Sequence, residues 1–183
     1  MSSVVISGDT SGTVSLTVPA VSGTNTATLP AATGTVMVSG NMPAFSAILT
    51  SGSIGLTSNT ITKVPLNSIQ FDTNSNFNAT TNYRFTPTVA GYYQINGTVR
   101  VLGTAISGGG VFLYKNGAAY LQSNTSVPPS VDSSIGSISS VIYFNGSTDY
   151  VELYLFTIGT GLAMNGSAIP YTCLMSGCLV RAA

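Results

Sequence analysis

One stretch of the chain alternates clearly between apolar and polar residues. From 92 to 102 the odd positions are Tyr93, Ile95, Gly97, Val99 and Val101, and polar residues dominate the even positions. A period of two predicts a β-strand that buries one face. Asn-Gly at 96–97 would suggest a turn, but the alternation continues through it in phase. We therefore expect a bulge or a close backbone approach there.

The rest of the chain repeats this pattern in shorter pieces. Runs rich in Val, Ile, Thr, Tyr and Phe are separated by Gly and Pro, and no long window shows a helical period. This spacing is typical of a β-sandwich or barrel, so we predict an all-β fold. Asn116-Gly117 predicts a hairpin over 111–122, because this pair supplies the positive φ angles of a tight turn. A second hairpin is predicted to join 138–144 to 150–156 through residues 145–149.

The strands of the second predicted hairpin are apolar on both faces. Ile142 and Phe144 alternate with Val141 and Tyr143, and the second strand repeats the pattern around Tyr154. A single sandwich buries only one face of each sheet, so something else must cover the other face. An identical subunit is the simplest cover, since large exposed apolar patches mark interfaces. The residues predicted for this interface are Phe45, Tyr93, Tyr143, Phe144 and Tyr154.

Charge is scarce, at 5% of residues with a formal net charge of zero, against roughly 25% in typical domains. A neutral surface favours association between copies, although a monomer wetted by hydroxyl groups is equally consistent with the composition. The five cations are scattered, which argues against nucleic acid as a partner. No apolar run is long enough to span a membrane, and no secretory signal begins the sequence, so neither membrane nor export is expected.

Catalytic groups are few. The chain has no His, which removes Ser-His and Cys-His nucleophile systems and most zinc sites. Asp149 and Glu152 are the nearest pair for glycan cleavage, but Asp149 resembles a turn residue and Glu152 is expected to be solvated or at an interface. We expect no enzyme, metal or cofactor; a calcium site would need Asp72, Asp132 and Asp149 to converge. Cys173 and Cys178 are expected to be reduced and buried.

The composition changes near residue 42. Residues 4–40 contain no aromatic side chain and a single charge, Asp9, and a segment without large side chains cannot build its own core. We therefore divide the chain into an extended attachment or stalk segment, 1–42, and a folded domain, 43–183. The first segment must pack against copies of itself or a host surface, unless it is a flexible linker.

Residues 43–183 resemble the jelly-roll heads of the tumour-necrosis-factor and complement globular-head families. The motifs that carry this resemblance are Pro43 to Ala47, Phe71-Asp72 with Tyr83 to Pro87 and Ala90 to Tyr93, Val111 to Gly117, Ser139 to Val141 with the Asp149 turn and Tyr150 to Leu153, and Ser176 to Val180. The order of the motifs matches the families. Two features depart from them: the two cysteines stand where aromatic residues are usual, and 103–110 is unusually rich in glycine. The resemblance implies an antiparallel jelly-roll sandwich that forms a homotrimer.

Residues 6–36 resemble a stretch common in bacteriophage fibre and other virion proteins. With the head, this resemblance implies a non-enzymatic virion structural protein, assembled in the bacterial host cytoplasm. It would be a trimeric short fibre or surface knob whose residues 1–42 bind capsid or tail proteins. Loops such as 103–110 and 123–134 would contact a host glycan or protein. The alternative is a capsid decoration or head-fibre protein without a receptor role; a depolymerase is the least favoured.

Overall fold

A computed structural model describes residues 3–17, 19–21, 23–26, 31, 36, 38, 42–50, 52–125, 131–167 and 170–183. The chain forms two compact units, Met1–Gly34 and Thr35–Ala183. Within the described residues all the regular secondary structure is β-strand. This part of the chain has no helix that is long and apolar enough to cross a membrane. The predicted 123–134 loop is wrong at both ends, because 118–125 and 131–144 are strands; its middle, 126–130, lies outside the described residues.

The N-terminal unit contains one antiparallel hairpin, β1 (Ser3–Ser7) with β2 (Thr13–Thr17). The register pairs Val4 with Leu16 and Ile6 with Val14. All four of these apolar side chains are more than half exposed. The hairpin has no core of its own, as expected for a segment without aromatic residues.

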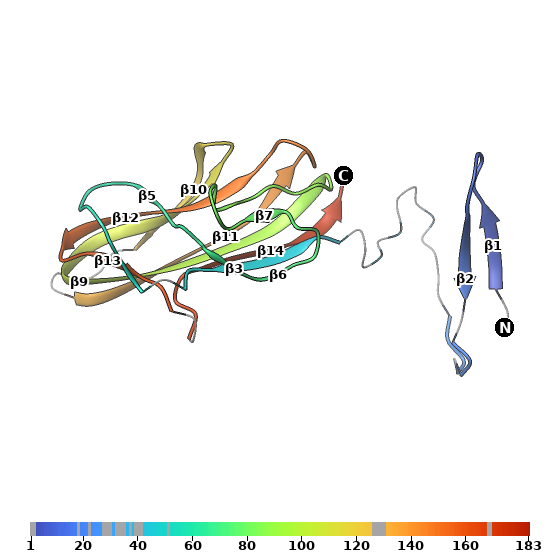
Figure 1. Cartoon of the computed structure of the whole chain (residues 1–183), viewed down its shortest axis with the longest axis horizontal. Coiled ribbons are helices and arrows are strands. Elements are labelled where there is room, and N and C mark those ends of the chain that lie inside the picture. Colours follow the sequence, from blue (N-terminus) through green and yellow to red (C-terminus); the bar gives the residue numbers. More distant parts are fainter. Residues whose placement is uncertain are drawn as a thin grey trace. The chain divides into compact units, whose positions relative to one another are not determined.

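In the described residues of the larger unit, a 12-stranded antiparallel sheet folds into two layers (Figure 1). The first layer has the order β6 (Ser68–Asp72), β3 (Ala44–Ile48), β14 (Leu174–Ala182), β9 (Gly91–Lys115) and β11 (Val131–Phe144). The second layer contains β10 (Ala118–Thr125), the later part of β9, β12 (Val151–Thr160), β8 (Arg84–Phe85) and β7 (Phe77–Asn78). The short strands are β4 (Ser53–Gly55), β5 (Thr62–Lys63) and β13 (Ala163–Asn165); β5 pairs with β12, and β13 pairs with β4 and β9.

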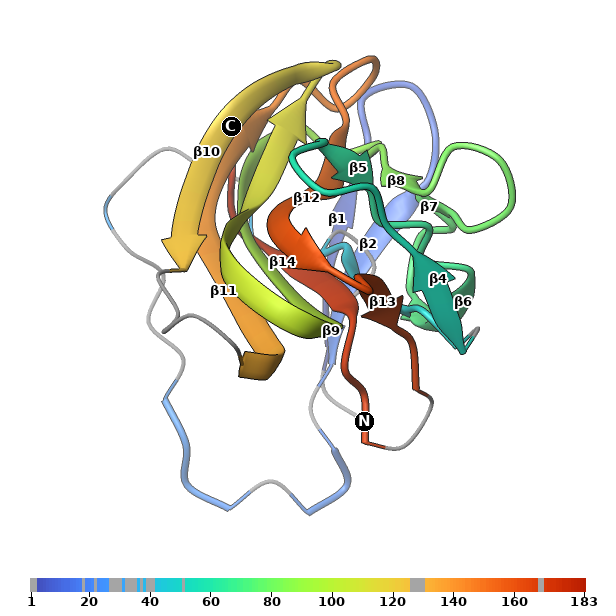
Figure 2. The same ribbon diagram turned by 90° about the vertical axis from the view of Figure 1, so that its left-hand side faces the viewer.

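Strand β9 belongs to both layers. Its residues from Gly91 to Leu102 pair with β11 and β14, and those from Ala105 to Lys115 pair with β10 and β12. Figure 2 shows the strong curvature of this 25-residue strand. The glycine-rich stretch 103–110 is therefore strand, which corrects its prediction as an exposed loop. Close packing explains part of its glycine content: a Cβ on Gly109 would lie 2.6 Å from the Phe156 carbonyl oxygen.

The predicted hairpin between 138–144 and 150–156 is wrong. β11 pairs with the early part of β9, whereas β12 pairs with β5, β8 and the later part of β9. Residues 145–150 consequently carry the chain from one layer to the other. Each strand finds its partner on β9, and this non-local pairing is not visible in the local alternation.

Two other local predictions are confirmed. β9 and β10 form the hairpin at 111–122, and both Asn116 and Gly117 have positive φ, 53° and 80°. The early part of β9 buries its odd positions, and a Cβ on Gly97 would lie 2.5 Å from Leu153 Cδ1. Gly97 is thus a site of close approach between the layers, without a register shift at that position.

The core lies between the two layers. Phe45 stacks on Phe85 with ring centroids 4.0 Å apart, and Tyr93 and Phe144 meet edge to face at 5.5 Å. Burial of apolar side chains from both layers is the main stabilising term of such a sandwich. The fully buried large side chains include Phe45, Phe85, Tyr93, Phe144, Leu113, Leu153 and Ile95. The prediction of an all-β antiparallel jelly-roll sandwich is confirmed.

Candidate functional site

Part of the outer surface of the first layer carries almost no charge, and we call this part the neutral face. It consists of the outward side chains of residues 92–98 in β9, 137–143 in β11 and 174–181 in β14. The only charged residue in these ranges is Arg181, at one end. The register aligns Ser139 and Ser176 on either side of Asn96, and Val141 and Cys178 on either side of Gln94.

Polar side chains fill the middle of the neutral face, and apolar ones lie at one end. The Gln94 amide nitrogen donates to Ser139 Oγ at 2.7 Å, and this hydroxyl donates to Asn96 Oδ1 at 2.9 Å. Tyr92 and Tyr143 lie opposite each other with ring centroids 5.4 Å apart, and they are 45% and 41% exposed. Val141 beside them is 49% exposed. Such a surface costs little to dehydrate, because it presents few ionic groups.

Three of the five predicted interface residues lie in the core and not on the neutral face. Phe45, Tyr93 and Phe144 are 0% exposed within one chain, so their side chains cannot contact a partner. The Tyr93 hydroxyl donates to the Val89 carbonyl at 2.8 Å, and burial raises the pKa of Tyr93 to about 12. The prediction is wrong for these three because a period of two shows which residues share a face, but not which face is inside.

The other two predicted residues lie on opposite outer surfaces. Tyr143 is on the neutral face, whereas Tyr154 is on the outer surface of the second layer. The structure therefore does not bring the five residues together. Tyr92 and Val141 belong to the neutral face and were missed; the signal that could have found them is their alternation with the buried residues Tyr93 and Ile142.

The outer surface of the second layer is aromatic and carries a partly buried ion pair. Tyr154 stacks on Tyr114 at 4.1 Å between ring centroids. The Lys63 ammonium donates to Glu152 Oε1 at 2.6 Å, and Glu152 is only 4% exposed. Glu152 was expected to be solvated or at an interface; it is instead an internal partner that ties β5 to β12.

The charge of Glu152 affects both of its neighbours. Burial alone would lower the pKa of Lys63, but the hydrogen bond and negative charge of Glu152 outweigh burial and raise it. Burial also raises the pKa of the Tyr154 phenol, and the Glu152 charge adds to that effect. Lys63 is thus held protonated. A lysine in this state is a poor general base.

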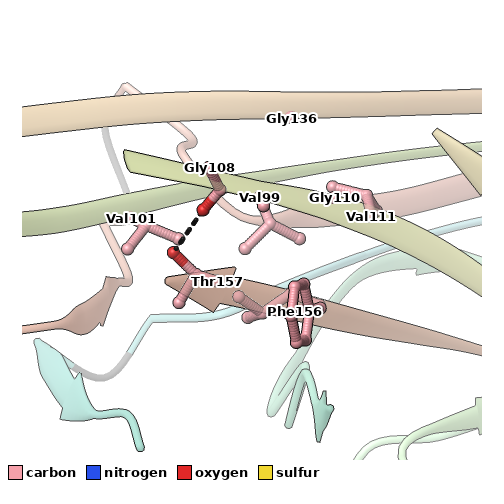
Figure 3. Close-up of a pocket in the computed structure, with 10 residues that line it drawn as sticks. Val99, Val101, Gly108, Gly110, Val111, Gly136, Phe156 and Thr157 are labelled. Carbon is pink, nitrogen blue, oxygen red and sulfur yellow. Dashed lines mark hydrogen bonds between the residues drawn. The ribbon is translucent and has the colours of Figure 1, made fainter. Parts of the chain in front are cut away.

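A small cavity lies inside the sandwich, near the glycine-rich part of β9 (Figure 3). Its volume is about 20 Å³, which is room for about one water molecule. Thr157 Oγ1 donates to the Gly108 carbonyl at 3.3 Å beside it. The cavity is too small for an organic ligand, so we interpret it as a packing gap left by Gly108 to Gly110.

Within the described part of the chain, no group of three or more His, Cys, Asp or Glu residues could hold a metal ion. Both cysteines are free thiols. Cys173 is buried as predicted, and burial raises its thiol pKa. Cys178 is exposed on the neutral face, which corrects its predicted burial: strand alternation in β14 places its neighbours Gly177 and Leu179 inside.

Comparison with known proteins identifies the fold. No family model matches the chain, and no curated protein matches it. The Eiger TNF structure from S. frugiperda superimposes with a TM-score of 0.60 at 12% identity, covering 78% of this chain and 95% of that one. Murine APRIL at pH 5.0 gives a TM-score of 0.56 at 12% identity, covering 76% and 99%. At this identity the likeness supports a TNF-like β-sandwich head, the coarser part of the predicted resemblance.

Proposed function

We propose that this chain is a non-enzymatic structural protein of a bacteriophage particle. In this proposal residues 43–183 form a homotrimeric knob, and residues 1–42 attach it to capsid or tail proteins. The knob would serve as a short fibre or surface knob that contacts the host. The N-terminal resemblance to virion proteins and the composition of the two units support this assignment.

The neutral face is the observation that carries the proposal. It combines exposed Tyr92, Val141 and Tyr143 with hydroxyl and amide groups, and only its end carries a charge. Surfaces of this kind have almost no ionic groups to desolvate when an identical copy covers them. In a closed ring of three copies each contact is head to tail, so this face would pack against a different part of the neighbouring copy. A trimer would place this face between subunits.

The N-terminal hairpin supports the attachment role. Val4, Val5 and Ile6 of β1 are 61%, 56% and 56% exposed, so adjacent positions on both sides of the strand carry uncovered aliphatic groups. A two-stranded hairpin with no covering layer is at best marginally stable in water. Contact with other copies or with another virion protein would cover these side chains.

Native mass spectrometry tests the oligomeric state. One chain has a mass of 18.7 kDa, so a trimer gives about 56 kDa, three times that value. A species at this mass that persists on dilution is the expected result. A single species at the mass of one chain contradicts the proposal.

The alternative role is a capsid decoration or head-fibre protein that stabilises the head without binding a receptor. The same N-terminal hairpin favours it, because attachment to a lattice needs only that segment. Imaging the particle with a labelled copy of the chain separates the two roles. Label on the tail tip supports the fibre, and label spread over the head supports decoration.

A further inference from the structure

The outer surface of the second layer contains an open polar pocket beside β7 and β8, two short strands that continue the layer beyond β12 (Figure 2). Its volume is about 330 Å³, within the roughly 300–1,000 Å³ range of small-ligand sites. The lining residues are Ser75, Asn76, Phe77, Asn78, Asn82, Arg84, Thr86 and Thr88. None of them is acidic, and one is a cation.

Arg84 is the cation, and the structure holds it in place. Its guanidinium lies over the Tyr150 ring, 4.2 Å from the centroid. The register places Asn78 opposite Arg84 on β7 and Glu152 opposite it on β12. Cation–π stacking fixes the plane of an arginine while leaving its N–H groups free for another partner.

The carboxylates around Arg84 and Phe77 have other partners. Asp72 Oδ2 accepts from the Phe77 backbone N–H at 2.6 Å. Lys63 lies 2.6 Å from Glu152, and Lys115 lies 3.1 Å from Asp149. Among the carboxylates whose side chains the structure describes, none forms an ion pair with Arg84. Arg84 therefore offers a positive charge to the pocket in a chain with only five Lys and Arg residues.

The other residues that line the pocket indicate which groups a ligand would carry besides a negative charge. The Asn82 amide and the Thr86 hydroxyl can donate and accept hydrogen bonds, which suits a ligand covered in hydroxyl groups. Asn78 offers only its Nδ2 donor, because its Oδ1 already accepts from the Thr81 and Asn82 backbone N–H groups at 2.9 and 3.0 Å. Asn76 is held from within: its Oδ1 accepts from the Thr88 backbone N–H at 3.2 Å, and its Nδ2 donates to the Asn74 carbonyl at 3.0 Å. One side of the pocket is therefore fixed before any ligand binds.

We propose that this pocket binds an acidic sugar unit of a glycan. Arg84 would pair with the sugar carboxylate through two parallel N–H donors, and the amide and hydroxyl groups would bind the ring hydroxyls. A nucleic acid would need several cations at phosphate spacing, whereas the pocket has one. The inference names a ligand class for the proposed surface role, but it uses residues of a single chain.

Titration calorimetry with a matched pair of probes tests the pocket. Oligogalacturonate carries a carboxylate on each ring, and a galactose oligomer of the same length and linkage is its neutral counterpart. We expect the full chain to bind the acidic probe at least tenfold more tightly than the neutral one. Added salt should weaken the acidic interaction, because its charged contact lies near the surface.

Two variants and a control locate the binding. R84Q should weaken binding of the acidic probe tenfold or more, whereas R181Q, which removes an exposed arginine of the first layer, should not. Asn82→Phe keeps the backbone N–H that donates to Asn78 Oδ1 at 3.0 Å and fills the pocket with a ring. It should abolish binding with Arg84 still present, and the thermal midpoint of each variant checks that it is folded.

Equal binding of both probes, unchanged binding by R84Q or Asn82→Phe, or no binding of oligogalacturonate would each overturn the proposal. These outcomes are separate from the mass measurement of the oligomer. If the protein is a trimer that does not bind the probe, the proposed structural role stands and the proposed ligand site is contradicted. If it is a monomer that binds the probe, the trimer is contradicted and the ligand site stands.

Discussion

The two partners of the Lys63–Glu152 ion pair differ in burial. Glu152 is 4% exposed, whereas the Lys63 side chain is 32% exposed. Removing the lysine strands a carboxylate in the protein, whereas replacing the carboxylate by an amide leaves a lysine that can still reach water. The two single changes should therefore differ in cost.

We predict that Lys63→Met destabilises the fold by about 2 kcal/mol, less than the roughly 3–5 kcal/mol of a fully buried pair because Lys63 is partly exposed. Glu152→Gln should cost about half as much. Denaturant unfolding at equal protein concentration measures both. An equal cost for both variants would contradict this account.

The glycines of β9 offer a second prediction at the scale of single residues. A Cβ on Gly109 would lie 2.6 Å from the Phe156 carbonyl oxygen, whereas a Cβ on Gly108 meets nothing within 4 Å. Gly109→Ala should cost about 1–3 kcal/mol, because backbone atoms must move. Gly108→Ala should be neutral or stabilising by up to about 1 kcal/mol, because it restricts the unfolded chain. Thermal unfolding of the two variants measures both effects. An unchanged thermal midpoint for Gly109→Ala would argue against the close contact between β9 and β12 at this position.

At the scale of elements, the connection between β11 and β12 is held by side chains of two turns. Asp149 accepts a hydrogen bond from the Asn116 amide at 2.7 Å and lies 3.1 Å from the Lys115 ammonium. These contacts, with the backbone N–H of Asn145, lower the pKa of Asp149 below its usual 3.8. The β9–β10 turn and the crossing between layers are thereby joined at one end of the sandwich.

This shift predicts a dependence of stability on pH. Because the pKa is lower in the folded chain, the unfolded chain takes up a proton first as the pH falls below 3.8. The stabilisation from Asp149 is complete above that value and is lost as the pH falls through the folded pKa. The thermal midpoint of the native chain should fall more steeply than that of Asp149→Asn between about pH 5 and pH 2. Parallel curves for the two proteins would contradict the prediction.

Local patterns predicted those elements whose partners are close in sequence. The 92–102 alternation and the Asn116-Gly117 turn each depend on a few adjacent residues, and both are confirmed. The crossing at 145–150 could not be predicted in the same way. The crossing arises because β9 bends from one layer to the other, and β11 and β12 pair with different halves of it. These pairs join residues up to 55 positions apart, as between Ala105 and Thr160.

At the scale of the whole molecule, the two outer surfaces differ in chemistry. The neutral face combines exposed Val141 and Tyr143 with uncharged polar groups, whereas the outer surface of the second layer carries Lys63, Glu152 and Arg84. The sequence predicted apolar residues on both faces of the strands, but its composition does not show which outer surface another copy would cover. The charge distribution favours the neutral face as the self-association surface, and it leaves the Arg84 pocket on the other side of the sandwich.

A matched pair of lysine substitutions tests this division. Val141 on the neutral face is 49% exposed, and Ile158 on the outer surface of the second layer is 41% exposed. Both are β-branched strand residues, so each lysine removes a similar side chain and adds the same charge. A lysine buried in a contact between copies would lose its hydration without a carboxylate partner, which disfavours assembly. We predict that Val141→Lys shifts the protein from about 56 kDa towards the 18.7 kDa chain in native mass spectra, whereas Ile158→Lys leaves the trimer unchanged. The reverse result would place the subunit contact on the second layer, and no shift with either lysine would mean that neither surface carries the contact.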